Sequence, residues 1–114
     1  MIHDEINTKF LGLYNDDEQL IGLMTNIHGD PLFQLHNKQG IPRLTCMVNK
    51  EGNPQINLLT PGGMSLAALH VTSDSSARFV LCNQYGARLL EIETENDTTT
   101  IKIRDAEDEI VREL

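Results

Sequence analysis

Apolar residues recur along this chain at a nearly constant interval of 22 or 23 positions, which is the strongest pattern in its sequence. Three columns of such residues share the same steps of 22, 23, 23 and 22. They are Leu11, Phe33, Ile56, Phe79 and Ile101; Leu13, Leu35, Leu58, Leu81 and Ile103; and Met24, Cys46, Leu69, Ile92 and Leu114. A shared period of this length marks a repeated supersecondary unit, so we predict five tandem repeats. Phe10, Ile21 and Leu23 offer an alternative apolar set for the first repeat.

Each repeat is divided by two short polar segments that have the composition of β-turns. The first segments begin at Asn15, Asn37, Thr60, Asn83 and Asp105, and the second at Asn26, Asn49, Thr72 and Glu95. Asn, Asp or Thr at the first position accepts a hydrogen bond from a backbone N–H two residues later, and Gly at the fourth adopts positive φ without strain. Five of the eight glycines occupy that fourth position. The strands between turns are roughly six to eight residues long, so we predict an all-β antiparallel meander of about ten short strands.

The turns also predict which residues face each other across neighbouring strands. Treating 37–40 as a four-residue loop places Phe33 opposite Leu44 and Leu35 opposite Pro42. A type I turn with a Gly bulge at 49–52 sets the register of the next hairpin. The direct pairs expected from it and its continuation are Cys46–Ile56, Leu44–Leu58, Leu69–Phe79, Ala67–Leu81, Phe79–Leu90 and Ile92–Ile101. One face of the predicted sheet is therefore almost continuously apolar.

The opposite face is predicted to be polar in the first and last strands and apolar in the middle. Its polar residues include Gln34, His36, Arg43, Thr45, Gln55, Asn57, Glu91, Glu93, Lys102 and Arg104. Its central apolar residues are Leu66, Ala68, Val80, Cys82 and Leu89. A solvated sheet does not require a second apolar patch, so we predict that these five residues form an oligomer interface.

An apolar sheet face must be covered by a second layer. We expect residues 8–114 to form a single β-repeat domain, preceded by an N-terminal arm at 1–7, and to be closed by assembly into a symmetric homo-oligomer. An up-and-down barrel or a sandwich within one chain is the alternative closure. A β-solenoid would repeat at the same period, but the hairpin chemistry of both turns argues against it.

Composition and charge narrow the classes of partner. The chain has 114 residues, a net charge of −8, and two cysteines. The negative charge makes nucleic acid and anionic membrane surfaces poor partners. The absence of a signal-like or membrane-spanning segment, together with free thiols, predicts a cytoplasmic protein. Nine of the 17 acidic residues fall in the last 24 positions, either as a charged edge that repels further strands or as a surface for a basic partner or a cation.

No arrangement of residues with catalytic or metal-binding chemistry is recognisable in the sequence. His3, His28, His36 and His70 occupy unrelated positions of the repeat, so they predict no zinc site. The acidic runs 16–18 and 107–109 lack the alternating oxygen ligands and glycine of a calcium loop. Cys46 is predicted to lie on the apolar face and Cys82 on the opposite one, so no disulfide is expected. We therefore expect no enzymatic activity, no catalytic residue, no cofactor and no bound metal.

Two known repeat classes are similar in period. MORN hairpin repeats share it, but their Gly-x-Gly and Tyr/Trp signature is absent here. Tandem-hairpin proteins of bacteria, which are themselves uncharacterised, show Asp/Asn-x-x-Gly-x-x-Arg followed by Gly-x-Pro-x-Leu-x-Leu. This chain resembles them at Asn37-x-x-Gly40-x-x-Arg43, at Gly52-Asn-Pro54-x-Ile56-x-Leu58 and at Asn83-x-x-Gly86-Ala-Arg88. The resemblance covers about residues 8–114 and implies the hairpin architecture, with no active site to carry over.

The sequence thus favours a non-enzymatic structural or protein-interaction module that self-associates through apolar sheet faces. The residues identify no other protein partner. The alternative function is a small β-barrel that binds an apolar ligand among its aliphatic inward-facing side chains.

Overall fold

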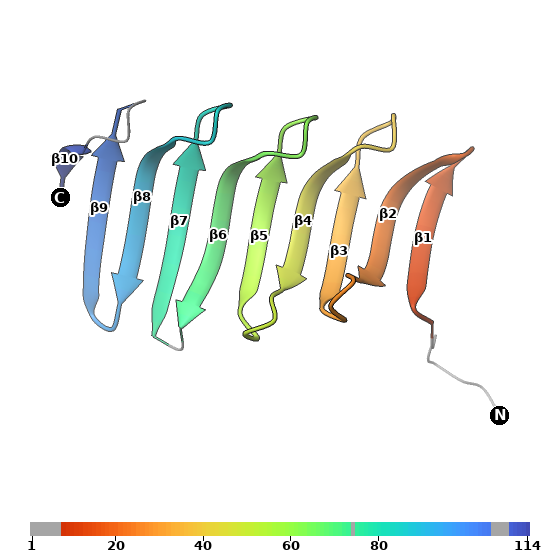
Figure 1. The fold of residues 1–114 in the computed structure, drawn as a ribbon, viewed down its shortest axis with the longest axis horizontal. Helices are drawn as coiled ribbons and strands as arrows, with labels where there is room; N and C mark the ends of the chain where they lie inside the picture. The colour runs from red at the N-terminus through yellow and green to blue at the C-terminus, as the bar shows by residue number, and fades with distance from the viewer. Residues whose placement is uncertain (1–7, 74, 106–109) are drawn as a thin grey trace.

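A computed structural model describes residues 8–73, 75–105 and 110–114, and over these residues the chain forms one antiparallel β-sheet (Figure 1). The strands lie in the sheet in their order along the chain. They are β1 (Phe10–Asn15), β2 (Glu18–Thr25), β3 (Pro31–His36), β4 (Pro42–Val48), β5 (Pro54–Leu59), β6 (Ser65–Ser73), β7 (Ser76–Cys82), β8 (Arg88–Glu95), β9 (Thr98–Arg104) and β10 (Ile110–Glu113). The predicted all-β meander of ten short strands is confirmed. The predicted arm at 1–7 lies outside the described residues.

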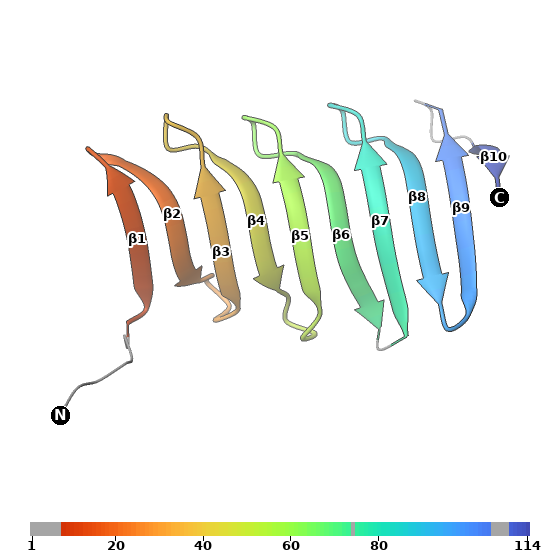
Figure 2. The ribbon, with the colours of Figure 1, turned by 180° about the vertical axis from the view of Figure 1, so that it is seen from behind.

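The sheet is open at both ends. β1 and β10 are its two outermost strands and do not pair with each other. Figures 1 and 2 show the same single layer of strands from its two sides, and among the described residues no other element covers either face. The radius of gyration is 17.3 Å, whereas a compact domain of this length has a radius of about 13 Å. A barrel or sandwich closed within one chain is therefore wrong for this structure, and the antiparallel pairing excludes a solenoid.

The turns form because side-chain oxygens replace missing backbone partners. Asn37 Oδ1 accepts hydrogen bonds from the backbone N–H groups of Gln39 (3.0 Å) and Ile41 (3.1 Å). The backbone N–H of Asn37 donates to the carbonyl of Ile41, and that of Gly40 donates to the carbonyl of Asn37. The turns that begin at Asn26, Asn49 and Asn83 repeat this arrangement. The glycine at the fourth position has positive φ in all of them, as predicted.

The turn that begins at Thr60 allows the conformational role of glycine to be tested, because it contains two adjacent glycines. Gly63 has a φ of +89°, whereas Gly62 does not have positive φ, and a Cβ would meet no heavy atom within 3.4 Å at either residue. We expect Gly63→Ala to lower the free energy of unfolding by about 1–2 kcal/mol, because only the left-handed backbone penalises the methyl group. Gly62→Ala is the matched control, expected to be neutral or stabilising by up to about 1 kcal/mol. Urea denaturation at one protein concentration measures both; equal losses would contradict this account.

The observed register confirms part of the predicted pairing and corrects the rest. Cys46–Ile56, Leu44–Leu58, Leu69–Phe79, Ala67–Leu81 and Ile92–Ile101 are direct pairs, as predicted. The pairs Phe33–Leu44, Leu35–Pro42 and Phe79–Leu90 are wrong by two residues; the observed pairs are Phe33–Cys46, Leu35–Leu44 and Phe79–Ile92. The reason is that 37–40 does not form the assumed four-residue loop. It forms the same turn as 49–52, and a bulge follows it.

A bulge lies beside the first turn of each of the first four repeats. The residues without a direct partner are Leu20, Arg43, Leu66 and Leu89, spaced by 23 residues. Continued without a bulge, this turn would pair Leu35 with Arg43, and Leu44 would point to the opposite side of the sheet. The unpaired Arg43 shifts the pairing by one residue, so Leu44 lies opposite Leu35 on the same side. The bulge is therefore what keeps every apolar column on one side of the sheet.

Candidate functional site: the two faces of the sheet

Two rows of apolar side chains cross β1 to β9 on one side of the sheet, which we call the apolar face. The first row is Leu11, Leu23, Phe33, Cys46, Ile56, Leu69, Phe79, Ile92 and Ile101. The second row is Leu13, Ile21, Leu35, Leu44, Leu58, Ala67, Leu81, Leu90 and Ile103. Neither row contains a charged or amide side chain. The predicted continuity of this face is confirmed.

The apolar face is open to solvent in the single chain. Leu13, Leu58 and Leu69 keep 56%, 47% and 49% of their surface exposed. Leu11, Leu23, Ile56 and Leu81 are exposed as well, and none of the described members of the two rows is buried. At about 4.8 Å between strands and 6.8 Å between same-side residues, the two rows span about 600 Å² of sheet plane. That is the upper end of the range for the largest apolar patch on a typical monomer, about 300–600 Å².

The other side, which we call the mixed face, holds the buried side chains. Its middle row is Gly12, Gly22, Gln34, Thr45, Asn57, Ala68, Val80, Glu91 and Lys102. Val80 is the one buried apolar side chain among the described residues, at 6% exposure, and Thr45, Asn57 and Glu91 are buried in the same row. Longer side chains from the positions on either side of this row contact its members, as Gln55 does with Asn57 and Arg104 does with Glu91. The arrangement is the reverse of an ordinary core, because the polar side of the sheet is better covered than the aliphatic side.

The buried amide of Asn57 is satisfied by its neighbours on the mixed face. Its Nδ2 donates to Thr45 Oγ1 (3.3 Å), and its Oδ1 accepts from Gln55 Nε2 (3.0 Å) and Ser65 Oγ (3.3 Å). Since a buried amide without partners is costly, these bonds explain how a polar residue can occupy the middle of the sheet.

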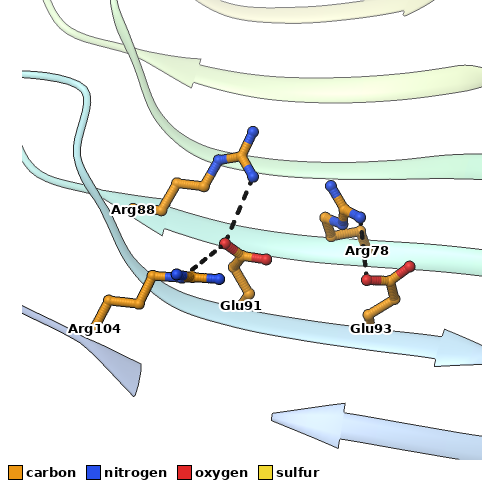
Figure 3. A network of polar contacts seen from close by, with 5 residues as sticks. All are labelled: Arg78, Arg88, Glu91, Glu93 and Arg104. Atoms are coloured by element: carbon orange, nitrogen blue, oxygen red, sulfur yellow. Dashed lines mark hydrogen bonds and ion pairs between the residues drawn. The ribbon is translucent and has the colours of Figure 1, made fainter. Parts of the chain in front are cut away.

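Further along the same row, Glu91 on β8 is held between two arginines. Its Oε1 lies 3.2 Å from Arg104 Nε and 3.6 Å from Arg88 Nη1. Figure 3 shows the two guanidinium groups approaching the carboxylate from different sides. Beside them, Arg78 Nη2 and Glu93 Oε2 form a second ion pair at 3.1 Å, also drawn in Figure 3. Glu91 and Arg104 are both well covered, so this ion pair is screened less by solvent than a surface pair.

This network changes the interpretation of the acidic C-terminal stretch. Glu91 and Glu93 lie on β8, which is an interior strand, so they do not form a charged edge. Both are ion-paired with arginine; Glu91 is buried, whereas the Glu93 side chain keeps about a third of its surface exposed. The sequence signal was the spacing of Arg88 and Glu91 together with the cross-strand pair Glu91–Lys102, which brings Arg104 within diagonal reach. The acidic run 107–109 lies outside the described residues.

The imidazole of His70 lies on β6 beside these ion pairs. Burial lowers the pKa of His70, the nearby Arg78 and Arg88 guanidinium groups lower it further, and Glu93 partly opposes them. The neutral ring is therefore favoured in the folded chain.

The lowered pKa of His70 predicts a loss of stability on acidification. The unfolded chain binds a proton at this residue near the ordinary value of about 6.5, before the folded chain does. The free energy of unfolding should therefore fall as the pH drops below about 6.5, until the lower folded pKa is passed. Thermal denaturation between pH 7.5 and 5 measures this loss. The loss should be smaller in His70→Gln; a variant with the same pH profile as the wild type would rule His70 out as its source.

The five residues predicted as an oligomer interface lie on β6, β7 and β8. Ala68 and Val80 are direct cross-strand neighbours in the middle row of the mixed face. Leu66 and Leu89 are bulge residues beside the turns that precede their strands, and Cys82 ends β7. Val80 is buried within the single chain, whereas Leu66 is exposed. The patch is thus smaller and more covered than the apolar face, and its role as an interface stays a prediction.

The two cysteines are free thiols on opposite faces. Cys46 on β4 belongs to the apolar face, between Phe33 and Ile56, and Cys82 on β7 belongs to the mixed face. Both are partly exposed. Within residues 8–73, 75–105 and 110–114, no three His, Cys, Asp or Glu side chains come together in a way that could hold a metal ion. His3 and the acidic run 107–109 lie outside these residues.

No helix in the described part of the chain could span a membrane. No protein-family model matches the chain, and no curated protein is detectably similar to it.

Proposed function

We propose that this protein is a non-enzymatic structural or protein-interaction module that self-associates through apolar sheet faces. The observation that carries the proposal is the open apolar face, which spans nine strands and keeps several leucines about half exposed. A sheet with such a face requires a second layer, and the described residues of one chain supply none. The resemblance to tandem-hairpin proteins of bacteria is part of the same proposal, as is a cytoplasmic location, which the two free thiols support.

The absence of enzymatic activity is also proposed. Its support is the pairing of the central acidic groups, since Glu91 and Glu93 are both ion-paired with arginines. A catalytic acid or base requires access to a substrate, and Glu91, at 6% exposure, offers little.

Sedimentation equilibrium between 1 and 100 μM tests self-association. The expected result is a mass that exceeds the 12.8 kDa of one chain and increases with protein concentration. A single species of 12.8 kDa over the whole range would overturn the proposal.

An apolar ligand is the second candidate occupant. One end of β2 to β5 carries a shallow hollow of about 440 Å³, lined in part by Leu23, Phe33, Cys46 and Ile56. The closed barrel expected for such a carrier is absent, so a ligand would lie on an open surface. Native mass spectrometry of the protein as purified decides this, since a carrier retains a lipid-sized adduct.

A further inference from the structure

We infer that the apolar face is covered by the same face of a second copy of this chain, in a symmetric two-layer sandwich centred on β5. The inference rests on the proposed self-association and specifies its surface and its occupant. Both faces of the sheet carry apolar residues. Their exposure, charge and area indicate which of the two faces binds the second copy.

Exposure favours the apolar face. Its middle strands present Ile56, Leu58 and Leu69 at 42%, 47% and 49% exposure. On the mixed face the middle row presents Asn57 on β5 and Val80 on β7, both of which the chain itself already buries. Binding energy at an interface concentrates on residues that lose their exposure near its centre. Contact through the mixed face would gain little from Val80.

Charge separates the two faces as well. The rows of the apolar face contain no ionisable side chain other than the Cys46 thiol, so a second copy opposes no like charges. The mixed face presents Arg78, Arg88 and Glu93, which would have to lose water in a close contact.

The dimensions match one further copy. The two apolar rows cover about 600 Å² of sheet plane, and the residues that flank them on the same side of nine strands of about seven residues extend the face to about 1,000 Å². Each partner in a standard stable interface contributes about 800 Å². The occupant must be equally flat, apolar and wide, and the chain's own apolar face meets all three conditions. Two such faces pack about 10 Å apart with their strands within about 30° of each other.

The small residues of the apolar face support a self-complementary contact. Cys46 on β4 and Ala67 on β6 are the two small side chains of the rows, and they lie on either side of β5. Around a two-fold axis through β5, parallel to the strands, Cys46 faces Leu69 of the second copy and Ala67 faces its Leu44. Each small residue then leaves room for a leucine, which is the complementarity that a packed sandwich requires.

The two native thiols test the inference without any substitution. Cys46 reports on the apolar face and Cys82 on the mixed face, and both are partly exposed in the single chain. The protein is labelled with a maleimide at 1 and 100 μM, the modified residue is identified by mass spectrometry, and sedimentation is measured in parallel. We expect labelling of Cys46 to slow at least tenfold at the concentrations where the dimer forms, while labelling of Cys82 stays constant.

The remaining outcomes distinguish the inference from the proposed function. A monomer at every concentration overturns both. An oligomer in which Cys82 is protected and Cys46 reacts overturns the inference and leaves self-association standing through the patch of Leu66, Ala68, Val80, Cys82 and Leu89. An oligomer in which both thiols react also overturns it, because the contact is then made by the edge strands.

A pair of variants gives an independent measurement. Leu58→Glu places a charge on β5 at the centre of the apolar face, and Leu66→Glu places the same charge at an exposed bulge residue of β6. We expect Leu58→Glu to weaken dimerisation at least 100-fold and Leu66→Glu to change it less than fivefold. Circular dichroism checks that strand content is retained. Dissociation by Leu66→Glu alone would contradict the inference, and thiol labelling still decides it if Leu58→Glu does not fold.

Discussion

Val80→Asp should cause the largest loss of stability of any single substitution considered for this chain, at least about 4 kcal/mol. Val80 is 6% exposed and lies directly opposite Glu91 on the neighbouring strand. The new carboxylate would be buried and would face a carboxylate that is itself buried. The existing arginines already serve Glu91, so the added negative charge has no dedicated partner.

Urea denaturation followed by circular dichroism measures the effect of Val80→Asp. Val80→Thr is the matched control, since it keeps the branched shape and adds one hydroxyl without a charge. We expect that control to lose about 1–2 kcal/mol. If Val80→Asp were as stable as Val80→Thr, the middle row of the mixed face would be open to water, and the burial argument would fail.

Glu91→Ala should have the second largest effect, a loss of about 2–4 kcal/mol in the free energy of unfolding. The substitution removes the carboxylate that Arg104 and Arg88 share, and it leaves the Arg104 guanidinium, which is 17% exposed, without its Glu91 acceptor. Breaking a covered ion pair from one side is costly because the remaining charge stays desolvated.

Glu93→Ala is the control for Glu91→Ala. It also removes an ion pair with arginine, but both partners are about a quarter to a third exposed. Its expected loss is below about 1 kcal/mol, as for other solvent-screened pairs. The two variants are compared by urea denaturation at one protein concentration and one salt concentration. Equal losses would show that burial of Glu91 does not strengthen its interactions.

The architecture was predictable because it depends on local signals. Asn49 and Gly52 are enough to specify a turn in which one side-chain oxygen binds two backbone N–H groups, and the spacing of such turns determines strand length. The alternation of apolar residues then assigns the sides of the sheet. Asn37 and Gly40 specify the same turn, but the sequence alone also fits a four-residue loop there. Both arrangements put Leu35 and Leu44 on one side of the sheet, because the bulge at Arg43 compensates for the different turn.

The burial of the mixed face was not predictable from the same signals. Arg88 and Glu91 lie on β8 and Arg104 lies on β9. The contact between Glu91 and Arg104 is diagonal, because the residue directly opposite Glu91 is Lys102. Alternation identifies which side a residue occupies and does not report how far a long side chain bends over its neighbours. For that reason the sequence identifies Val80 as part of a second apolar patch, while the structure buries it within one chain.

The unpaired residue beside each first turn has a consequence for how such a chain tolerates changes in length. Leu66 has no direct partner, while Ser65 pairs with Leu59 and Ala67 pairs with Leu58. Excising Leu66 leaves those two pairs compatible with regular alternation, so every later side chain keeps its orientation. Loss of a residue inside a regular ladder inverts the orientations that follow it. Each of the four bulges beside a first turn is therefore a position at which the chain can lose one codon while the later side chains stay on their own side of the sheet.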